Sequence, residues 1–128
     1  MIKGKILLID DDEDDQFIFQ DALKEISFPY DCLLASNGLE AVSKLTSDED
    51  LPAMIFLDLN MPLMNGAEFL SHIRDHPSFR EIPIVIFSTS NNQVYKEMLP
   101  KPGAILFITK TANFKELKEK LKTILQGL

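Results

Sequence analysis

The segment Lys5-Ile6-Leu7-Leu8-Ile9-Asp10-Asp11 joins a short apolar run to a pair of acidic residues. An aliphatic run of this length, bounded by charged residues, is typical of a buried β-strand, which we predict over Lys5–Ile9. Residues 15–26 carry apolar side chains three or four positions apart, and this spacing predicts a helix with one buried face. This part of the chain is therefore expected to form a strand followed by a helix that packs on it.

The same alternation continues to the end of the sequence. Apolar runs predict five strands, at Lys5–Ile9, Asp31–Ala35, Met54–Leu57, Ile84–Phe87 and Ile105–Ile108. Further helices are predicted over residues 114–125 and over a short stretch at Asn91–Leu99. An Asn that precedes a Glu by three residues resembles a capping box and marks a helix start at Asn37/Glu40, at Asn65/Glu68 and, for the last helix, at Asn113/Glu116. Apolar strands that alternate with helices predict a doubly wound α/β domain, with a five-stranded parallel sheet and helices on both faces.

The length and the charge of the chain restrict the classes of function that it can have. The 128 residues suffice for one ordinary domain, and the net charge of −7 arises mainly from six consecutive acidic residues at positions 10–15. This cluster would repel nucleic acid, and no basic stripe with interleaved aromatic residues compensates for it. A cation is the expected partner of the cluster, and neither nucleic acid nor a membrane is expected as a partner.

The compartment is expected to be the cytoplasm. The longest unbroken apolar stretches have five residues, too short for a membrane helix, and the N-terminal segment lacks the apolar core of a signal peptide. The single cysteine, Cys32, excludes an internal disulfide and is interpreted as a small buried hydrophobic residue.

Chemically reactive side chains follow the ends of the predicted strands: Asp10 and Asp11, Asp58, Ser88 and Lys110. The carboxyl ends of parallel strands meet at one edge of a sheet, where α/β domains bind their ligands. Clustered carboxylates suit Mg²⁺, and a lysine with a hydroxyl would add an anion site beside it. Adjacent cation and anion sites favour phosphoryl transfer, in which charge stabilisation provides most of the catalysis.

The segment Ile55-Phe56-Leu57-Asp58-Leu59-Asn60-Met61-Pro62-Leu63-Met64-Asn65-Gly66 is the most specific motif of the chain. Together with the acidic pair, Ser88 and Lys110, it resembles the receiver domain of two-component response regulators. The resemblance extends over essentially all 128 residues. It implies the flavodoxin-like strand order 2-1-3-4-5 and one receiver domain over residues 1–128 without an output domain.

The resemblance also implies a role for each matching residue. Asp58 would accept a phosphoryl group from a sensor histidine kinase or a phosphotransfer protein. Asp10, Asp11, Asp58 and the backbone carbonyl of Asn60 would hold Mg²⁺. The chain would act on a downstream protein target through altered binding, and would be a self-phosphorylating and self-dephosphorylating phosphoacceptor rather than an enzyme.

Three further residues complete the implied switch. Lys110 would pair with the phosphoryl oxygens, Ser88 would move onto them, and Phe107 would turn inward as Ser88 moves. Thr111 departs from the family pattern, which has proline after the lysine, so the placement of Lys110 is less firmly implied than that of Asp58. Lys101, followed by Pro102, is an alternative lysine, but it precedes the last predicted strand.

Two other functions remain open at this stage. A haloacid-dehalogenase-type phosphatase would use Asp10 as nucleophile and Asp12 as general acid, although Asp14 departs from its motif. A receiver fold that binds partners without phosphorylation would be consistent with Thr111. Two simpler interpretations concern polar residues: Asp12 to Asp15 as solvated residues of a helical first turn, and His72 and His76 as surface residues.

Overall fold

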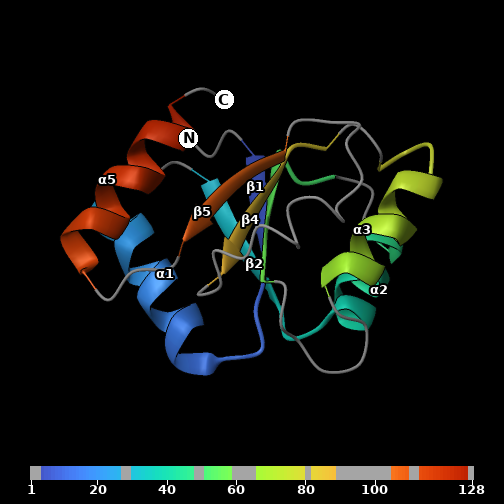
Figure 1. Cartoon of the computed structure of the whole chain (residues 1–128), viewed down its shortest axis with the longest axis horizontal. Coiled ribbons are helices and arrows are strands. Elements are labelled where there is room, and N and C mark those ends of the chain that lie inside the picture. Colours follow the sequence, from blue (N-terminus) through green and yellow to red (C-terminus); the bar gives the residue numbers. More distant parts are fainter. Residues whose placement is uncertain are drawn as a thin grey trace.

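The sheet has the strand order β2-β1-β3-β4-β5, and all neighbouring strands are parallel (Figure 1). The computed structural model describes residues 4–26, 30–47, 51–58, 66–79, 82–88, 105–109 and 113–126. The strand bounds are β1 (Gly4–Ile9), β2 (Tyr30–Ala35), β3 (Met54–Leu57), β4 (Ile84–Ser88) and β5 (Ile105–Thr109). The parallel α/β sheet expected from the sequence is confirmed, and its strand ends agree with the predicted ones to within one residue.

Helices cover both faces of this sheet. Their bounds are α1 (Glu13–Glu25), α2 (Gly38–Ser47), α3 (Gly66–Asp75) and α5 (Phe114–Leu125). Helices α1 and α5 lie side by side on one face, and α2 and α3 lie on the other (Figure 1). The helix predicted over Asn91–Leu99 lies outside the described residues. Within the described ranges, every helix is too short or too polar to cross a bilayer.

The core consists of two layers separated by the sheet, because successive strand residues point to opposite faces. In β1, Ile6 and Leu8 pack toward α1 and α5, whereas Leu7 and Ile9 pack toward α2 and α3. The central strand β3 is buried along its whole length. Burial on both faces explains why the predicted strands read as continuous apolar runs rather than as alternating ones.

Helix α1 begins at Glu13, two residues before the predicted start, because Asp12 is its N-cap. The Asp12 carboxylate accepts hydrogen bonds from the backbone N–H groups of Asp14 and Asp15, at 2.8 and 3.2 Å. These bonds satisfy helical donors that have no partner within the helix. Asp12 is exposed, as the interpretation of a solvated residue expected, but it lies at the N-cap and not in the first turn, which contains Glu13, Asp14 and Asp15.

The predicted Asn caps are present at two of the three helices. Asn37 accepts from the Glu40 N–H at 2.8 Å, and Asn113 accepts from the Glu116 N–H at 3.1 Å. Glu40 does not close a standard capping box, since its carboxylate accepts the N–H of Ser36, which precedes the cap residue. The third predicted cap, Asn65, lies outside the described residues.

Replacing Asn113 with alanine is expected to lower the free energy of unfolding by about 1 kcal/mol, the usual cost of losing an N-cap. The variant Asn113→Asp keeps a side-chain oxygen that can accept the Glu116 N–H, so it should retain most of the stability. Urea unfolding monitored by circular dichroism measures both variants. Equal losses in the two would show that the cap bond contributes nothing measurable.

Cys32 is half-buried rather than fully buried, against α1 and α5. Its thiol donates to the backbone carbonyl of Leu33 at 3.8 Å. Burial disfavours the thiolate and raises the pKa of Cys32 from 9.0 to about 12. The thiol is therefore protonated and unreactive near neutral pH.

This raised pKa predicts a pH dependence of stability. Below about pH 9 the thiol is protonated in both the folded and the unfolded chain, and its contribution to stability is fully present. Between about pH 9 and 12 the unfolded chain releases the proton while the folded chain keeps it, so stability falls as the pH rises. The free energy of unfolding of the wild type and of Cys32→Ala is measured by denaturant unfolding, and the contributions of other titrating groups cancel in the difference between the two. That difference should change from about pH 8 to about pH 11 in the direction that destabilises the wild type, and a constant difference would contradict the assignment.

Candidate metal and phosphorylation site

Asp10 and Asp58 are adjacent because they directly follow paired residues of neighbouring strands. Ile9 of β1 is in register with Leu57 of β3. The Asp58 N–H donates to the Ile9 carbonyl at 2.9 Å, which continues the ladder by one residue. On the other side, the Asp10 N–H donates to the Ala35 carbonyl of β2 at 3.0 Å. Backbone pairing therefore holds both acidic residues at the carboxyl edge of the sheet.

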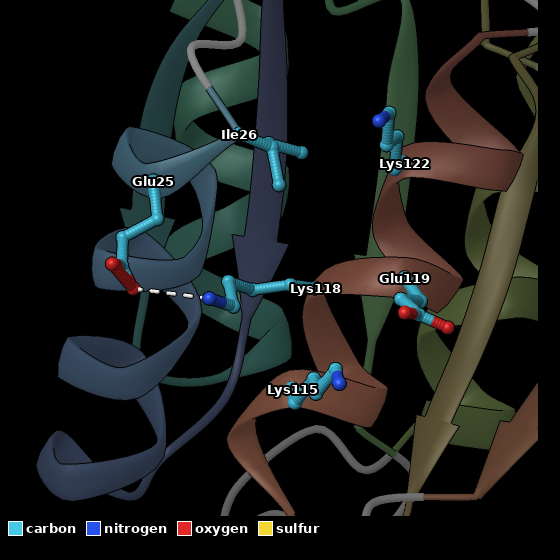
Figure 2. Close-up of a pocket in the computed structure, with 6 residues that line it drawn as sticks. All are labelled: Glu25, Ile26, Lys115, Lys118, Glu119 and Lys122. Atoms are coloured by element: carbon cyan, nitrogen blue, oxygen red, sulfur yellow. Dashed lines mark hydrogen bonds and ion pairs between the residues drawn. The ribbon is translucent and has the colours of Figure 1, made fainter.

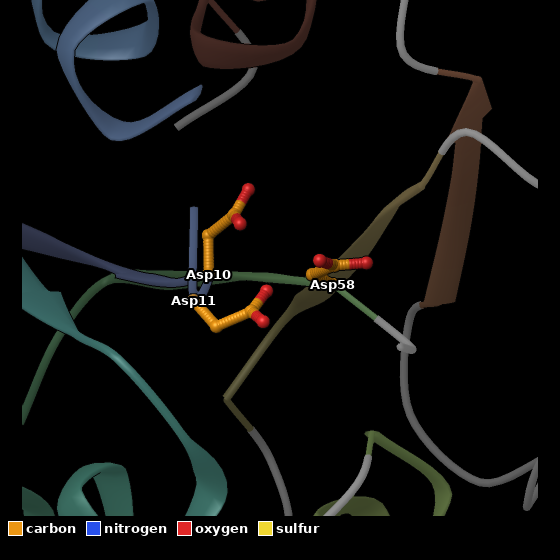
Figure 3. Close-up of side chains that lie close together, drawn as sticks. All are labelled: Asp10, Asp11 and Asp58. Atoms are coloured by element: carbon orange, nitrogen blue, oxygen red, sulfur yellow. The ribbon is translucent and has the colours of Figure 1, made fainter. Parts of the chain in front are cut away.

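Three carboxylates gather at this edge, from Asp10, Asp11 and Asp58 (Figure 3). Each offers one oxygen, and these oxygens lie within 4.8 Å of one another. Asp10 is fully buried and Asp58 is only 7% exposed, whereas Asp11 is exposed. The convergence of these three residues, predicted from the strand ends alone, is confirmed.

Such a cluster fits a divalent cation. Carboxylates this close repel one another, and a cation between them relieves the repulsion. The donor atoms are all oxygens, which suits hard cations such as Mg²⁺, Mn²⁺ and Ca²⁺. The exposed Asp11 leaves one side of the cluster facing solvent. A cation held there could keep some of its water and still contact an incoming anion.

Hydrogen bonds fix the loop that carries the acidic pair. One Asp10 carboxylate oxygen accepts the Asp12 N–H at 3.0 Å. The Asp10 backbone carbonyl accepts the Gln16 side-chain N–H at 2.6 Å. The Gln16 backbone N–H in turn donates to the Asp12 carbonyl at 3.0 Å. The first turn of α1 therefore holds the loop that precedes it.

A second network supports the end of β2, next to Asp10. Lys44 of α2 donates to the backbone carbonyl of Leu34 and forms an ion pair with Glu40 at 3.4 Å. Glu40 also accepts the Ser36 N–H at 3.2 Å. These contacts hold the residues on either side of Ala35, whose carbonyl accepts the Asp10 N–H.

The other predicted site residues are described only in part. Ser88 is the last residue of β4 and is in register with Thr109, and Phe107 lies in β5 in register with Ile86. The side chains of Ser88 and Phe107 lie outside the description. Four further positions also lie outside the described residues: Asn60, Lys101, Lys110 and Thr111.

Gln16 and the capping role of Asp12 were missed by the sequence reasoning. The position of Asp12 three residues before Asp15, ahead of an amphipathic stretch, is a recognisable cap signal. Gln16 has no comparable signal, because glutamine is common on solvated helix faces and its reach to the Asp10 carbonyl depends on tertiary structure. The interpretation of the histidines holds for His72, which is exposed, whereas His76 is half-buried and stacks on Phe79 with the ring centroids 4.0 Å apart.

A groove of about 350 Å³ lies between α1 and α5, and none of its lining residues belongs to the carboxylate cluster. It is lined by Glu25, Ile26, Lys115, Lys118, Glu119 and Lys122. Figure 2 shows Lys118 and Glu25 reaching toward one another across it, and they form an ion pair at 3.4 Å. This pair links the two helices that cover one face of the sheet.

Comparison with known proteins gives the family. The family model for the response regulator receiver domain matches residues 6–122. The chain therefore belongs to the family of response regulator receiver domains, which accept phosphoryl groups in two-component signalling.

Individual relatives agree with this assignment. The chain is 33% identical over 121 residues to the chemotaxis protein CheY1 of Helicobacter pylori, covering 94% of this chain and 96% of the relative. The phosphorylated cyanobacterial phytochrome response regulator RcpA superimposes with a TM-score of 0.85 at 31% identity, covering 97% and 91% of the two chains. The Mn²⁺-bound form of response regulator Rcp1 superimposes with a TM-score of 0.80 at 29% identity, covering 93% and 89%. Divalent metal binding is thus found in a protein of the same family.

Proposed function

We propose that Asp58 is the residue that accepts the phosphoryl group. The observation that carries this proposal is the placement of its carboxylate: it is almost buried at the carboxyl edge of the sheet, within 4.8 Å of the carboxylate oxygens of Asp10 and Asp11. The Asp58 backbone is held by its bond to Ile9, so the carboxylate projects from a rigid strand end. A nucleophile on a rigid strand end can be aligned with its phosphoryl donor.

The reaction is a substitution at phosphorus. A carboxylate oxygen of Asp58 forms a bond to the phosphorus of a phosphohistidine as the phosphorus–nitrogen bond breaks. The imidazole leaves with the electron pair of that bond and takes up a proton. Asp58 becomes an acyl phosphate, whose phosphate carries about −1.5 to −2 charges in place of the single negative charge of the carboxylate.

We propose Mg²⁺ as the cation of this site. Asp10, Asp11 and Asp58 would hold it, and the Asn60 backbone carbonyl would complete the protein ligands. When bound, Mg²⁺ would neutralise charge on the phosphoryl oxygens during transfer. The oxygen-only donor set supports this proposal, as does the exposure of Asp11, because Mg²⁺ usually retains several waters.

The signalling output is proposed to be a change in protein binding. Receiver domains interact with histidine kinases and with downstream targets. Those of the CheY type generally act as signalling proteins rather than as enzymes. We propose that Lys110 pairs with the phosphoryl oxygens and that Ser88 and Phe107 respond to them. The new charge would then bias a two-state surface that a downstream protein recognises.

Acetyl phosphate labelling in the presence of Mg²⁺ tests the proposal. Intact-mass spectrometry should show the addition of one phosphoryl group, and trapping followed by peptide mapping should place it on Asp58. Removal of divalent cations with a chelator should abolish the labelling. Label on Asp10 would refute the proposal and favour the phosphatase alternative, in which Asp10 is the nucleophile.

The same experiment also tests the alternative of a receiver fold that works without phosphorylation. A folded wild-type chain that takes up no label with Mg²⁺ present would refute phosphoryl acceptance.

The phosphatase alternative already faces a structural obstacle, because the Asp12 carboxylate that would serve as general acid caps α1 by accepting two backbone N–H groups. Both N–H groups donate to Oδ1, so they hold this carboxylate against the start of the helix and restrain it from turning toward a leaving group.

A further inference from the structure

We infer that Gln16 is a positioning residue for the cation, acting through the peptide that joins Asp10 to Asp11. The inference rests on the proposed Mg²⁺ site. The Gln16 side chain donates to the Asp10 backbone carbonyl at 2.6 Å. That carbonyl belongs to the peptide unit whose nitrogen is the Asp11 N–H. Because a peptide unit is planar, the orientation of the Asp10 carbonyl sets the direction in which the chain enters Asp11.

The surrounding contacts show why this bond matters. The Asp10 N–H is fixed by Ala35 and its carboxylate by the Asp12 N–H. Asp11 is the exposed member of the three-carboxylate cluster. The bond from Gln16 therefore restrains the peptide between the fixed Asp10 and the exposed Asp11. Loss of this donor would leave the carbonyl of a fully buried residue without that partner and would let the peptide rotate.

The effect should depend on the size of the cation. Mg²⁺ requires nearly ideal octahedral geometry at short distances, whereas Ca²⁺ accepts longer and more irregular coordination. A displaced Asp11 carboxylate should therefore weaken Mg²⁺ binding more than Ca²⁺ binding. A purely structural role for Gln16 would lower the stability of the protein without changing the ratio of the two affinities.

The test is the variant Gln16→Met, which keeps the length of the side chain and its helix propensity but removes the N–H donor. Its matched control is Gln20→Met, the same change one turn further along α1. Titration of each folded protein with Mg²⁺ and with Ca²⁺, followed by the amide resonances of Asp11 and Asp12 in NMR spectra, gives the affinities. We expect Gln16→Met to weaken Mg²⁺ binding about 10-fold, the lower end of the usual effect of removing an outer-shell partner. Ca²⁺ binding should weaken less, and Gln20→Met should bind both cations as wild type does.

Three results would overturn the inference: unchanged Mg²⁺ affinity in Gln16→Met, an equal loss in Gln20→Met, or equal losses for both cations. If Gln16→Met does not fold, Gln16→Asn replaces it, because its amide is one methylene too short to reach the Asp10 carbonyl in the same geometry. Its Mg²⁺ affinity is then judged by the same criteria. Failure of the proposed metal site is distinguishable, because the wild-type protein itself would then show no response to Mg²⁺.

Discussion

Replacement of Asp58 by asparagine is expected to abolish phosphoryl labelling by acetyl phosphate while leaving the fold intact. The amide removes the anionic oxygen that attacks phosphorus, and it cannot form the acyl phosphate. The volume and shape of the side chain hardly change, so the backbone bond from the Asp58 N–H to Ile9 should persist. Intact-mass spectrometry measures the label, and circular dichroism with urea unfolding measures the fold.

The matched control is Asp31→Asn, which makes the same change in charge and shape at an exposed aspartate of β2. Asp31 is in register with Lys5 near the start of β1, so it lies toward the opposite end of the strands from Asp58. The control should accept the label as wild type does. Retained labelling in Asp58→Asn, or an equal loss in Asp31→Asn, would contradict the assignment of Asp58.

The stability of Asp58→Asn offers a second, independent measurement. In the absence of divalent cations, three carboxylate oxygens within 4.8 Å of one another repel. Neutralising one of them should raise the free energy of unfolding relative to wild type under those conditions. Adding Mg²⁺ stabilises a protein more when its folded state binds the cation more tightly, so the gain in the free energy of unfolding should be larger for the wild type. The order of the two stabilities is therefore expected to depend on the cation.

The convergence of Asp10, Asp11 and Asp58 could be predicted because it follows from backbone rules. A parallel sheet brings the carboxyl ends of its strands together, and an apolar run that ends in an acidic residue shows where each strand stops. The register Ile9 to Leu57 places Asp10 and Asp58 side by side, as these rules require. A two-residue error at the start of α1 did not affect this prediction, since the strand and not the helix positions the acidic pair.

Contacts that depend on side-chain reach could not be predicted in the same way. Glu40 accepts the Ser36 N–H instead of that of Asn37, and Gln16 reaches back to Asp10. Neither choice follows from residue type or spacing, because several backbone groups lie within reach of a long side chain. The half-buried state of Cys32 also depends on how α1 and α5 pack over β2, which periodicity does not specify.

Phe19→Ala is expected to lower the free energy of unfolding by about 3–5 kcal/mol, the usual cost of removing a buried aromatic ring. Phe19 is completely buried, and its ring meets that of Phe56 edge to face with the centroids 5.0 Å apart. This contact joins α1 to the central strand β3, two residues before Asp58. Because small domains are stable by only about 5–15 kcal/mol, the loss is a large share of the total. Urea unfolding at 25 °C measures it, and Phe19→Leu provides a milder variant if the alanine variant does not fold.

Phe17→Ala is the matched control, since it makes the identical substitution on the same helix at a side chain that is 68% exposed. Any gain in helix propensity from alanine is common to both variants and cancels in the comparison. The control should change stability by no more than about 0.5 kcal/mol, as surface substitutions usually do. Similar losses in the free energy of unfolding for the two variants would show that α1 is not anchored through Phe19. Anchoring of α1 also bears on the site, because the same helix carries Gln16 and the Asp12 cap, so a loosened α1 would release the loop that presents Asp11.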